Sequence, residues 1–173
     1  LMQRSGAGEF LNDIAISLMG RYRGGAAKVA ITASSLFGSI SGSTVANVMS
    51  TGAITIPLMK RGGYSNTSAG AIEAVASTGG QLMPPVMGAV AFLMAEDLEV
   101  EYRVVAIAAL VPSFLYYVGL FVQADLEAAR EGISRVDEEL IPKFWTVLRR
   151  GWIFIIPFAI LIVGLFWLNF EPE

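Results

Sequence analysis

A charge-free run of 31 residues, 29–59, constrains the fold of this chain more than any other feature. The run is apolar on both flanks, but its middle, GSISGS, consists mainly of glycine and serine. As one straight helix it would measure about 46 Å at ~1.5 Å per residue, whereas the hydrocarbon layer of a bilayer is about 30 Å thick. The run therefore either crosses a membrane at a steep tilt or enters it and turns back.

The composition indicates that the chain lies in a membrane. Hydrophobic residues make up 54% of its 173 residues and charged residues 16%, and the mean hydropathy is +0.60. A soluble domain has about a quarter charged residues. Residues 104–124 and 151–170 contain no charge, and 62–95 contain only Glu73. Because about 20 apolar residues span a bilayer, these stretches are three predicted crossings.

The distribution of lysine and arginine distinguishes the two paths of the charge-free run. These residues gather on the cytoplasmic side of membrane proteins. A single crossing would divide the 12 of them five against seven, whereas a re-entrant hairpin would leave all except Arg103 on one side, eleven against one. The count favours the hairpin. It also predicts cytoplasmic loops around Arg61 and Arg149 and a periplasmic loop at 97–102.

The tip of the hairpin is predicted at residues 38–43, because glycine permits a turn and serine hydroxyls can satisfy freed backbone groups. Non-helical backbone at that depth is tolerated only where it is buried in protein or lines a polar cavity. The same residues allow another interpretation, since Gly38 and Gly42 form a GxxxG pair, a helix-packing motif of membrane proteins. The charge count favours the hairpin over a packing face.

A second polar interruption, ASTGGQLMPPVMG, occupies residues 76–88 within the next predicted crossing. Its two prolines remove backbone donors and its two adjacent glycines loosen the helix, which predicts a break near 78–85. A purely structural proline kink is the alternative. A broken helix beside a hairpin tip, however, is the arrangement that builds midplane sites in secondary transporters.

The predicted fold class is an all-α integral membrane protein with a re-entrant helical hairpin and a discontinuous transmembrane helix. Its predicted parts are an interfacial amphipathic helix (1–24), the hairpin (25–61), the discontinuous helix (62–96), a transmembrane helix (103–124), a cytoplasmic connector (125–150) and a transmembrane helix (151–170). The chain opens LMQRSGAGEF, in which no signal peptide is predicted. We expect it to be a fragment of a longer membrane protein.

The sequence argues against catalysis. An intramembrane serine protease needs a general base such as histidine, and the chain has no histidine and no cysteine. An aspartyl membrane protease needs two intramembrane carboxylates, and the four aspartates lie outside the apolar segments. The net charge of −3 gives no footprint for nucleic acid. We therefore expect no enzyme and no nucleic-acid partner.

The two interruptions do supply oxygen atoms. Serine, threonine and asparagine side chains and unwound carbonyls are suitable ligands for Na⁺, and helix N-termini attract anions. This pattern predicts a cation-coupled anion carrier. No carboxylate is expected near either interruption. We interpret Glu73 as a structural residue near a helix N-terminus, with a proton or cation site as the alternative.

At these interruptions the sequence resembles a known family. LFGSISGSTVANVMSTGAITIPLMKRGGY and GAIEAVASTGGQLMPPVMGAVAFLMAE closely resemble the large permease subunit of TRAP transporters, the tripartite ATP-independent periplasmic type. The variant AIEAVASTGGQ, with PSFLYYVGLFVQADLEA, looks most like the fused permeases that work with TAXI-type binding proteins. The resemblance runs from about Gly6 to Arg130 and more weakly to Trp167.

The resemblance implies an elevator-type secondary transporter of a prokaryotic inner membrane, built from two inverted halves. In that family a periplasmic solute-binding protein delivers an organic anion, a small permease subunit or its fused equivalent assists, and Na⁺ entry usually drives uptake. The hairpin tip matches residues 38–43 and the broken helix 77–85. Many relatives have aspartate at the position of Asn47, and this departure fits the TAXI-type branch. Only one hairpin and one broken helix are found, so the remaining half of the permease is also an expected partner.

These considerations give two sets of candidate residues. The hypothetical Na⁺ ligands are Ser39, Ser41, Ser43, Thr78 and Gly79. The hypothetical substrate-binding residues are Ser41, Gly42, Ser43, Asn47, Gly80, Gln81 and Pro84. No cofactor is expected apart from Na⁺ as the coupling ion. The alternative function is an ion channel whose re-entrant loop forms a filter, although a filter normally requires several identical loops around a pore.

Overall fold

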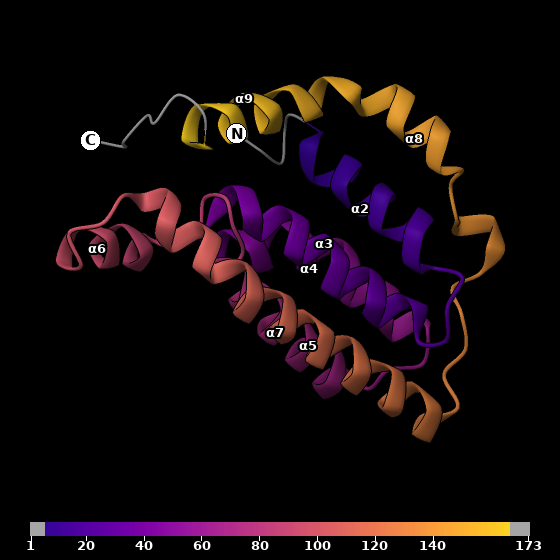
Figure 1. Cartoon of the computed structure of the whole chain (residues 1–173). Helices are drawn as coiled ribbons and strands as arrows, with labels where there is room; N and C mark the ends of the chain where they lie inside the picture. Colours follow the sequence, from indigo (N-terminus) through magenta and orange to yellow (C-terminus); the bar gives the residue numbers. More distant parts are fainter. Residues whose placement is uncertain (1–5, 167–173) are drawn as a thin grey trace.

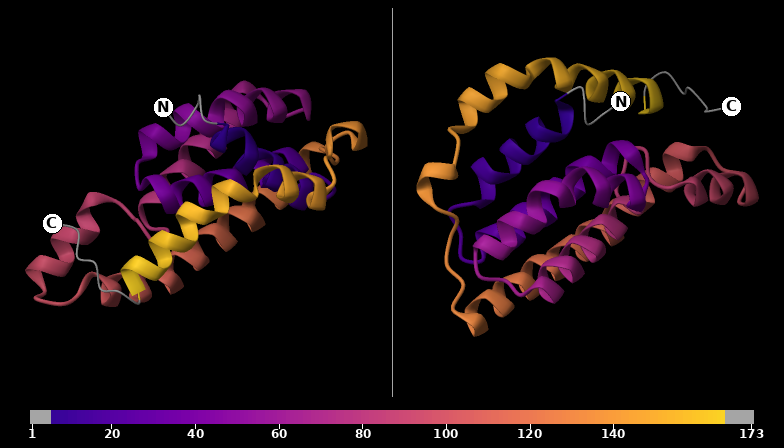
Figure 2. Two further views of the ribbon diagram at one scale, coloured as in Figure 1. Left: turned by 90° about the horizontal axis from the view of Figure 1, so that it is seen from above. Right: turned by 180° about the vertical axis from the view of Figure 1, so that it is seen from behind.

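The computed structural model describes residues 6–166, and in this range the chain forms helices and no strand, which confirms the all-α prediction. Helices α3, α4, α5 and α7 run alongside one another, α2 and the α8–α9 segment lie on one side of them, and α6 extends beyond them at one end (Figures 1 and 2). In chain order the elements are α2 (Ala7–Met19), α3 (Gly25–Ser41), α4 (Thr44–Arg61), α5 (Asn66–Thr78), η1 (Gly79–Gln81), α6 (Ala89–Asp97), α7 (Tyr102–Glu131), η2 (Glu138–Leu140), α8 (Phe144–Gly151), η3 (Trp152–Phe154) and α9 (Ile155–Phe166).

Helices α3 and α4 form a helical hairpin whose turn consists of Gly42 and Ser43. Gly42 has φ +57°, a left-handed conformation that favours glycine, and its N–H donates to the carbonyl of Gly38 at 2.9 Å. The Ser43 hydroxyl accepts from the N–H of Ala46 at 3.3 Å and caps α4. Because α3 ends at Ser41, the GxxxG pair does not lie on one straight helix.

The second interruption separates α5 from α6. Helix α5 ends at Thr78 and passes into the short η1 turn, and α6 begins only at Ala89. The intervening loop is fixed from two sides. The N–H of Val86 donates to the carbonyl of Ser39 at 3.1 Å, and the Tyr102 hydroxyl lies 2.8 Å and 2.6 Å from the carbonyl oxygens of Pro85 and Val86. The proline loop is thereby held between the hairpin and the start of α7.

Two stretches of the described chain are long and apolar enough to cross a membrane, Tyr102–Glu131 and Glu138–Gly164. Helix α7, with 30 residues, is about 45 Å long at ~1.5 Å per residue. The break leaves α5 and α6 with 13 and 9 residues, each too short to span alone. Large apolar side chains of α7 are exposed, namely Val104, Ile107, Leu110, Val111, Phe114, Leu115, Val118, Val122 and Leu126.

The base of the hairpin and the end of α5 lie at different levels of α7. At the base, Lys28 and Arg23 both bond to Asp125, six residues before the end of α7, with Lys28 at 2.6 Å. At the level of the break, Tyr116 and Tyr117 donate to carbonyls at the end of α5, with distances of 2.7 Å and 3.2 Å. The broken segment therefore lies beside the middle of α7, and the hairpin base lies beside its C-terminal end.

Helix α2 differs from its expected amphipathic pattern at one position. Phe10 and Leu11 pack in a cluster with Phe37 of α3 and Val147 of α8. The polar residue Asn12, which an amphipathic helix at an interface would expose, is 1% exposed, and its amide donates to the Gly8 carbonyl at 2.9 Å. The reason is that α2 is covered by α3 on one side and α8 on another. Its interfacial placement stays a prediction, and residues 1–5 and 167–170 of the predicted helices lie outside the described range.

Candidate functional site

The hairpin and the broken helix meet at a glycine crossing. A Cβ placed on Gly38 of α3 would lie 2.3 Å from the Cα of Gly80, and one placed on Gly80 would lie 2.7 Å from the Cα of Gly38. Real Cβ atoms do not approach other atoms this closely, so the two backbones touch only because both residues lack a side chain. The crossing joins the last turn of α3 to η1.

The hairpin turn makes a second close contact with the proline loop. A Cβ on Gly42 would lie 1.6 Å from the carbonyl oxygen of Met87. Met87 itself has φ 56°, an uncommon conformation for a residue with a side chain. The tip is thus packed backbone against backbone on the residues that follow the two prolines.

Asn47, predicted to contact substrate, bridges three helices. Its side chain has 0% exposure. Its amide donates to the carbonyl of Ser34 in α3 at 2.8 Å and lies 3.4 Å from the carbonyl of Ser77 in α5. Its Oδ1 lies 3.3 Å from the Thr51 hydroxyl oxygen. The last carbonyls of a helix have no intrahelical partner. The Asn47 amide lies within reach of the Ser77 carbonyl near the end of α5, so it helps to stabilise the end of the helix at the break.

The structure brings some of the predicted site residues together and leaves others apart. Gly80 and Asn47 are in contact, and Ser39, Gly42 and the proline loop are joined as described above. The hydroxyl groups of the predicted Na⁺ ligands Ser39 and Thr78 donate to backbone carbonyls of their own helices. Ser39 donates to the Leu36 carbonyl, and Thr78, which is exposed, donates to the Ala74 carbonyl, each at 2.8 Å.

The remaining candidates are Ser41 and Ser43 at the hairpin turn and Gly79, Gln81 and Pro84 in or after η1. The N–H of Ser43 donates to the Ser41 hydroxyl at 3.4 Å. Gln81 is exposed, and its carbonyl accepts from the N–H of Gly88 at 2.9 Å. Gly79 and Pro84 are buried. Among the predicted site residues, the glycines and prolines therefore determine the backbone conformation, and the serine hydroxyls lie at the hairpin tip.

Glu73, interpreted from the sequence as a structural residue near a helix N-terminus, lies in a buried polar cluster. Glu73 has 0% exposure and accepts hydrogen bonds from hydroxyls of α3, α4 and α5. The expectation that no carboxylate lies near either interruption is therefore wrong, because Ser77, one turn further along α5, joins Glu73 to the end of that helix. Glu73 is also beyond the first turn of α5, which begins at Asn66, so the explanation by a helix N-terminus does not apply.

A sequence signal for this cluster exists in the spacing of polar residues. Asn47, Thr51 and Thr55 follow one another at intervals of four in α4, which places them on one helix face. Glu73 and Ser77 have the same spacing in α5. When two neighbouring helices with few charges each carry a polar stripe, the two stripes are expected to face each other.

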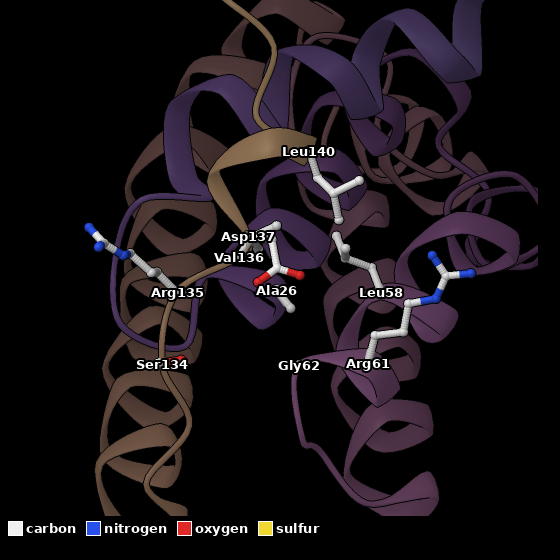
Figure 3. Close-up of a pocket in the computed structure, with 9 residues that line it drawn as sticks. All are labelled: Ala26, Leu58, Arg61, Gly62, Ser134, Arg135, Val136, Asp137 and Leu140. Carbon is white, nitrogen blue, oxygen red and sulfur yellow. The ribbon is translucent and has the colours of Figure 1, made fainter.

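A pocket lies away from these residues, at the base of the hairpin, where the start of α3 and the end of α4 meet the segment after α7. In the view of Figure 3 the carboxylate of Asp137 lies between the side chains of Arg135 and Arg61. No predicted substrate or Na⁺ residue lines it. Its lining residues are Ala26, Leu58, Arg61, Gly62, Ser134, Arg135, Val136, Asp137 and Leu140.

Comparison with known proteins agrees with the motifs. Residues 1–171 match the family model described as "Tripartite ATP-independent periplasmic transporter, DctM component". The chain is 27% identical over 99% of its length to the sialic acid TRAP transporter permease protein SiaT of Haemophilus influenzae, and covers 28% of that protein. It is 36% identical over 66% of its length to the C4-dicarboxylate TRAP transporter large permease protein DctM of Pseudomonas aeruginosa, and covers 26% of it.

A further relative is the uncharacterized protein YgiK of Salmonella typhimurium, 28% identical over 99% of the chain, which covers 39% of that relative. The chain thus spans well under half the length of these proteins. The match of the family model nevertheless extends over almost all of the chain. The chain therefore belongs to the DctM component family of the tripartite ATP-independent periplasmic transporters.

Proposed function

We propose that this chain is the part of a TRAP large permease that carries the hairpin and broken helix of one inverted half, and that the whole permease is an elevator-type carrier importing a small organic anion. The observation that carries the proposal is the junction of the hairpin tip with the broken segment. Gly38 touches Gly80, and Gly42 touches Met87. Discontinuous helices that meet in this way are the usual frame of a transporter site near the membrane midplane.

The proposed path of the hairpin through the membrane rests on α7. If this apolar 30-residue helix crosses the membrane, the tyrosines that contact the end of α5 lie near its middle, and the lysine and arginine at the hairpin base lie near its C-terminal end. The hairpin is then re-entrant. Residues 82–101, which precede the opposite end of α7, contain no lysine or arginine, as the positive-inside rule expects near a periplasmic loop.

The tip offers groups that suit an organic anion. Helix α4 begins there, and the free N–H groups of a helix N-terminus attract a carboxylate. The proposed contacts are Ser41, Gly42, Ser43 and Asn47 from the hairpin and Gly80, Gln81 and Pro84 from the broken segment. Relatives named for sialic acid, C4-dicarboxylates and 2,3-diketo-L-gulonate all carry organic acids in their names, which supports this substrate class for the present chain.

We further propose Na⁺ as a coupling ion at the tip, held by oxygens of the Ser39 to Ser43 segment and of Thr78 and Gly79. Na⁺, like other hard cations, takes oxygen ligands. The proposed partners are a TAXI-type periplasmic binding protein, a small permease subunit or its fused equivalent, and the remaining half of the permease, all in a prokaryotic inner membrane.

Uptake by the reconstituted full-length permease tests this function. The binding protein encoded beside the permease gene is purified, its bound organic acid is identified by mass spectrometry, and that acid is used in radiolabelled form with proteoliposomes. We expect saturable uptake that requires both the binding protein and an inward Na⁺ gradient. Ionic currents without the binding protein would instead support a channel, and uptake that ignores the binding protein would contradict the proposal.

A further inference from the structure

Glu73 lies in the middle of α5 with no exposed surface. It faces α4 at Gly52, where a Cβ would come within 3.2 Å of the Glu73 Cγ. Glutamate is almost never fully buried unless it is paired. Inside the apolar part of a membrane protein, an ionisable side chain is a candidate for function.

Four hydroxyl groups from three helices surround the Glu73 carboxyl. In α4, Thr51 donates to Oε1 at 2.5 Å and Thr55 donates to Oε2. Ser34 of α3 and Ser77 of α5 approach Oε1 at 3.3 Å and 3.2 Å. All four residues are buried. Each of these donors is uncharged, so they solvate the carboxyl without neutralising a negative charge on it.

The cations of the helices packed around Glu73 lie away from its carboxyl group. In α3, Lys28 pairs with Asp125 of α7 at 2.6 Å. In α4, Lys60 and Arg61 lie exposed at the end of the helix. Among the ion pairs within residues 6–166, none includes Glu73, and those of the other arginines are Arg23–Asp125, Arg103–Glu101, Arg130–Glu131 and Arg135–Glu138.

The element that covers α5 from the other side supplies no charge to this carboxyl either. Helix α7 faces the end of α5 with Tyr116 and Tyr117, and both hydroxyls donate to backbone carbonyls of α5. The η1 turn contributes Gly79, Gly80 and Gln81, which do not titrate. The surroundings of Glu73 are therefore polar, buried and without positive charge. A lone ionised carboxylate in such a place is costly, so a bound positive charge is needed at some stage.

The two threonines can serve the carboxyl in both of its charge states. The Thr51 hydroxyl lies 2.9 Å from the Asn47 carbonyl, and the Thr55 hydroxyl lies 3.0 Å from the Thr51 carbonyl. Each hydroxyl has one hydrogen and two lone pairs. It can donate to an ionised carboxylate, or turn to its backbone carbonyl and accept a hydrogen bond from a protonated carboxyl. The exchange needs only rotation of a hydroxyl group.

We propose that Glu73 is a proton-binding site of the permease, gaining and releasing a proton as the hairpin and broken helix change partners during transport. The carboxylate takes up H⁺ to become the neutral acid, and the same O–H bond breaks when the proton leaves. This inference rests on the proposed transport function and adds a second coupling ion to the Na⁺ proposed at the tip. A proton suits the cluster as it stands because it needs no additional volume, whereas Na⁺ would require several oxygens to move to about 2.4 Å from one point.

Infrared difference spectroscopy of the full-length permease in lipid tests the site with protons alone. A protonated carboxyl group has a C=O stretching band that the carboxylate lacks. Spectra are recorded as pH is varied, with and without NaCl, for the wild type, Glu73→Gln and the matched control Glu96→Gln, which alters an exposed carboxyl of the α6 end. We expect one pH-dependent band that the wild type and Glu96→Gln share and that Glu73→Gln lacks.

A second variant keeps the test independent of the folding of Glu73→Gln. Thr55→Val removes one hydrogen-bond donor to the carboxyl group but retains the group itself, so the band should remain in this variant at a shifted frequency. A band at every pH, no band at any pH, or a band that responds to NaCl and not to pH would each overturn the proton assignment. Because no substrate is used, these outcomes are separate from a failure of the uptake experiment.

Discussion

Replacing Gly42 by alanine in the full-length permease is expected to abolish uptake while leaving membrane insertion intact. The new Cβ would lie 1.6 Å from the Met87 carbonyl oxygen, so the hairpin turn and the proline loop must separate. Alanine at φ +57° adds a cost of roughly 1–2 kcal/mol, and overpacking adds roughly 1–3 kcal/mol. The measurement is uptake in proteoliposomes, with the amount of inserted protein determined in the same samples.

Gly132→Ala is the matched control for this variant. Gly132 follows α7 and has φ +68°, close to that of Gly42, but a Cβ there meets no atom within 4 Å. It therefore carries the conformational cost without the collision. Uptake by Gly132→Ala should stay close to the wild-type rate. If Gly42→Ala transports as well as Gly132→Ala, the contact between tip and proline loop is not required for transport.

Gly38→Ala is expected to lower the stability of the permease by roughly 1–3 kcal/mol, through forced separation of α3 and η1. The added Cβ would lie 2.3 Å from the Gly80 Cα and 3.2 Å from the Asn47 amide nitrogen, so it also disturbs the bridge between three helices. In a helix such as α3, alanine would otherwise be favoured over glycine by about 1 kcal/mol. Thermal unfolding in detergent measures the net effect.

Gly119→Ala is the control that measures the preference of a helix for alanine over glycine without a steric collision. Gly119 lies inside α7, and a Cβ there has no neighbour within 4 Å. This variant should unfold at the wild-type temperature or slightly above it, while Gly38→Ala unfolds below it. Equal unfolding temperatures for the two variants would contradict the glycine crossing.

Local chemistry explains what could be predicted from the sequence. A glycine before a serine inside an apolar run indicates a turn, and the chain turns at Gly42 and Ser43. Paired prolines cannot continue a helix, and α5 ends before them at Thr78. Both features depend on a few neighbouring residues, so they can be recognised without knowledge of the packing.

Contacts between distant residues could not be predicted in the same way. The Glu73 cluster joins Ser34, Thr51, Thr55 and Ser77, and it depends on the register of three helices against one another. The polar stripes of α4 and α5 indicate that such faces exist, but not which residues of each helix meet. The same holds for Asn47, whose buried bridge to α3 and α5 arises only after packing.

The central proposal is that the hairpin enters the membrane and returns to the side from which it came. Single cysteines can be placed in a cysteine-free full-length permease at Arg21 before α3, at Thr67 after α4 and at Glu99 before α7, positions that are exposed in the structure. An impermeant thiol reagent is then applied to each side of oriented membrane vesicles. The proposal predicts labelling of Arg21→Cys and Thr67→Cys from the cytoplasmic side only, and of Glu99→Cys from the periplasmic side only. Labelling of Arg21→Cys and Thr67→Cys from opposite sides would show a single crossing and contradict it.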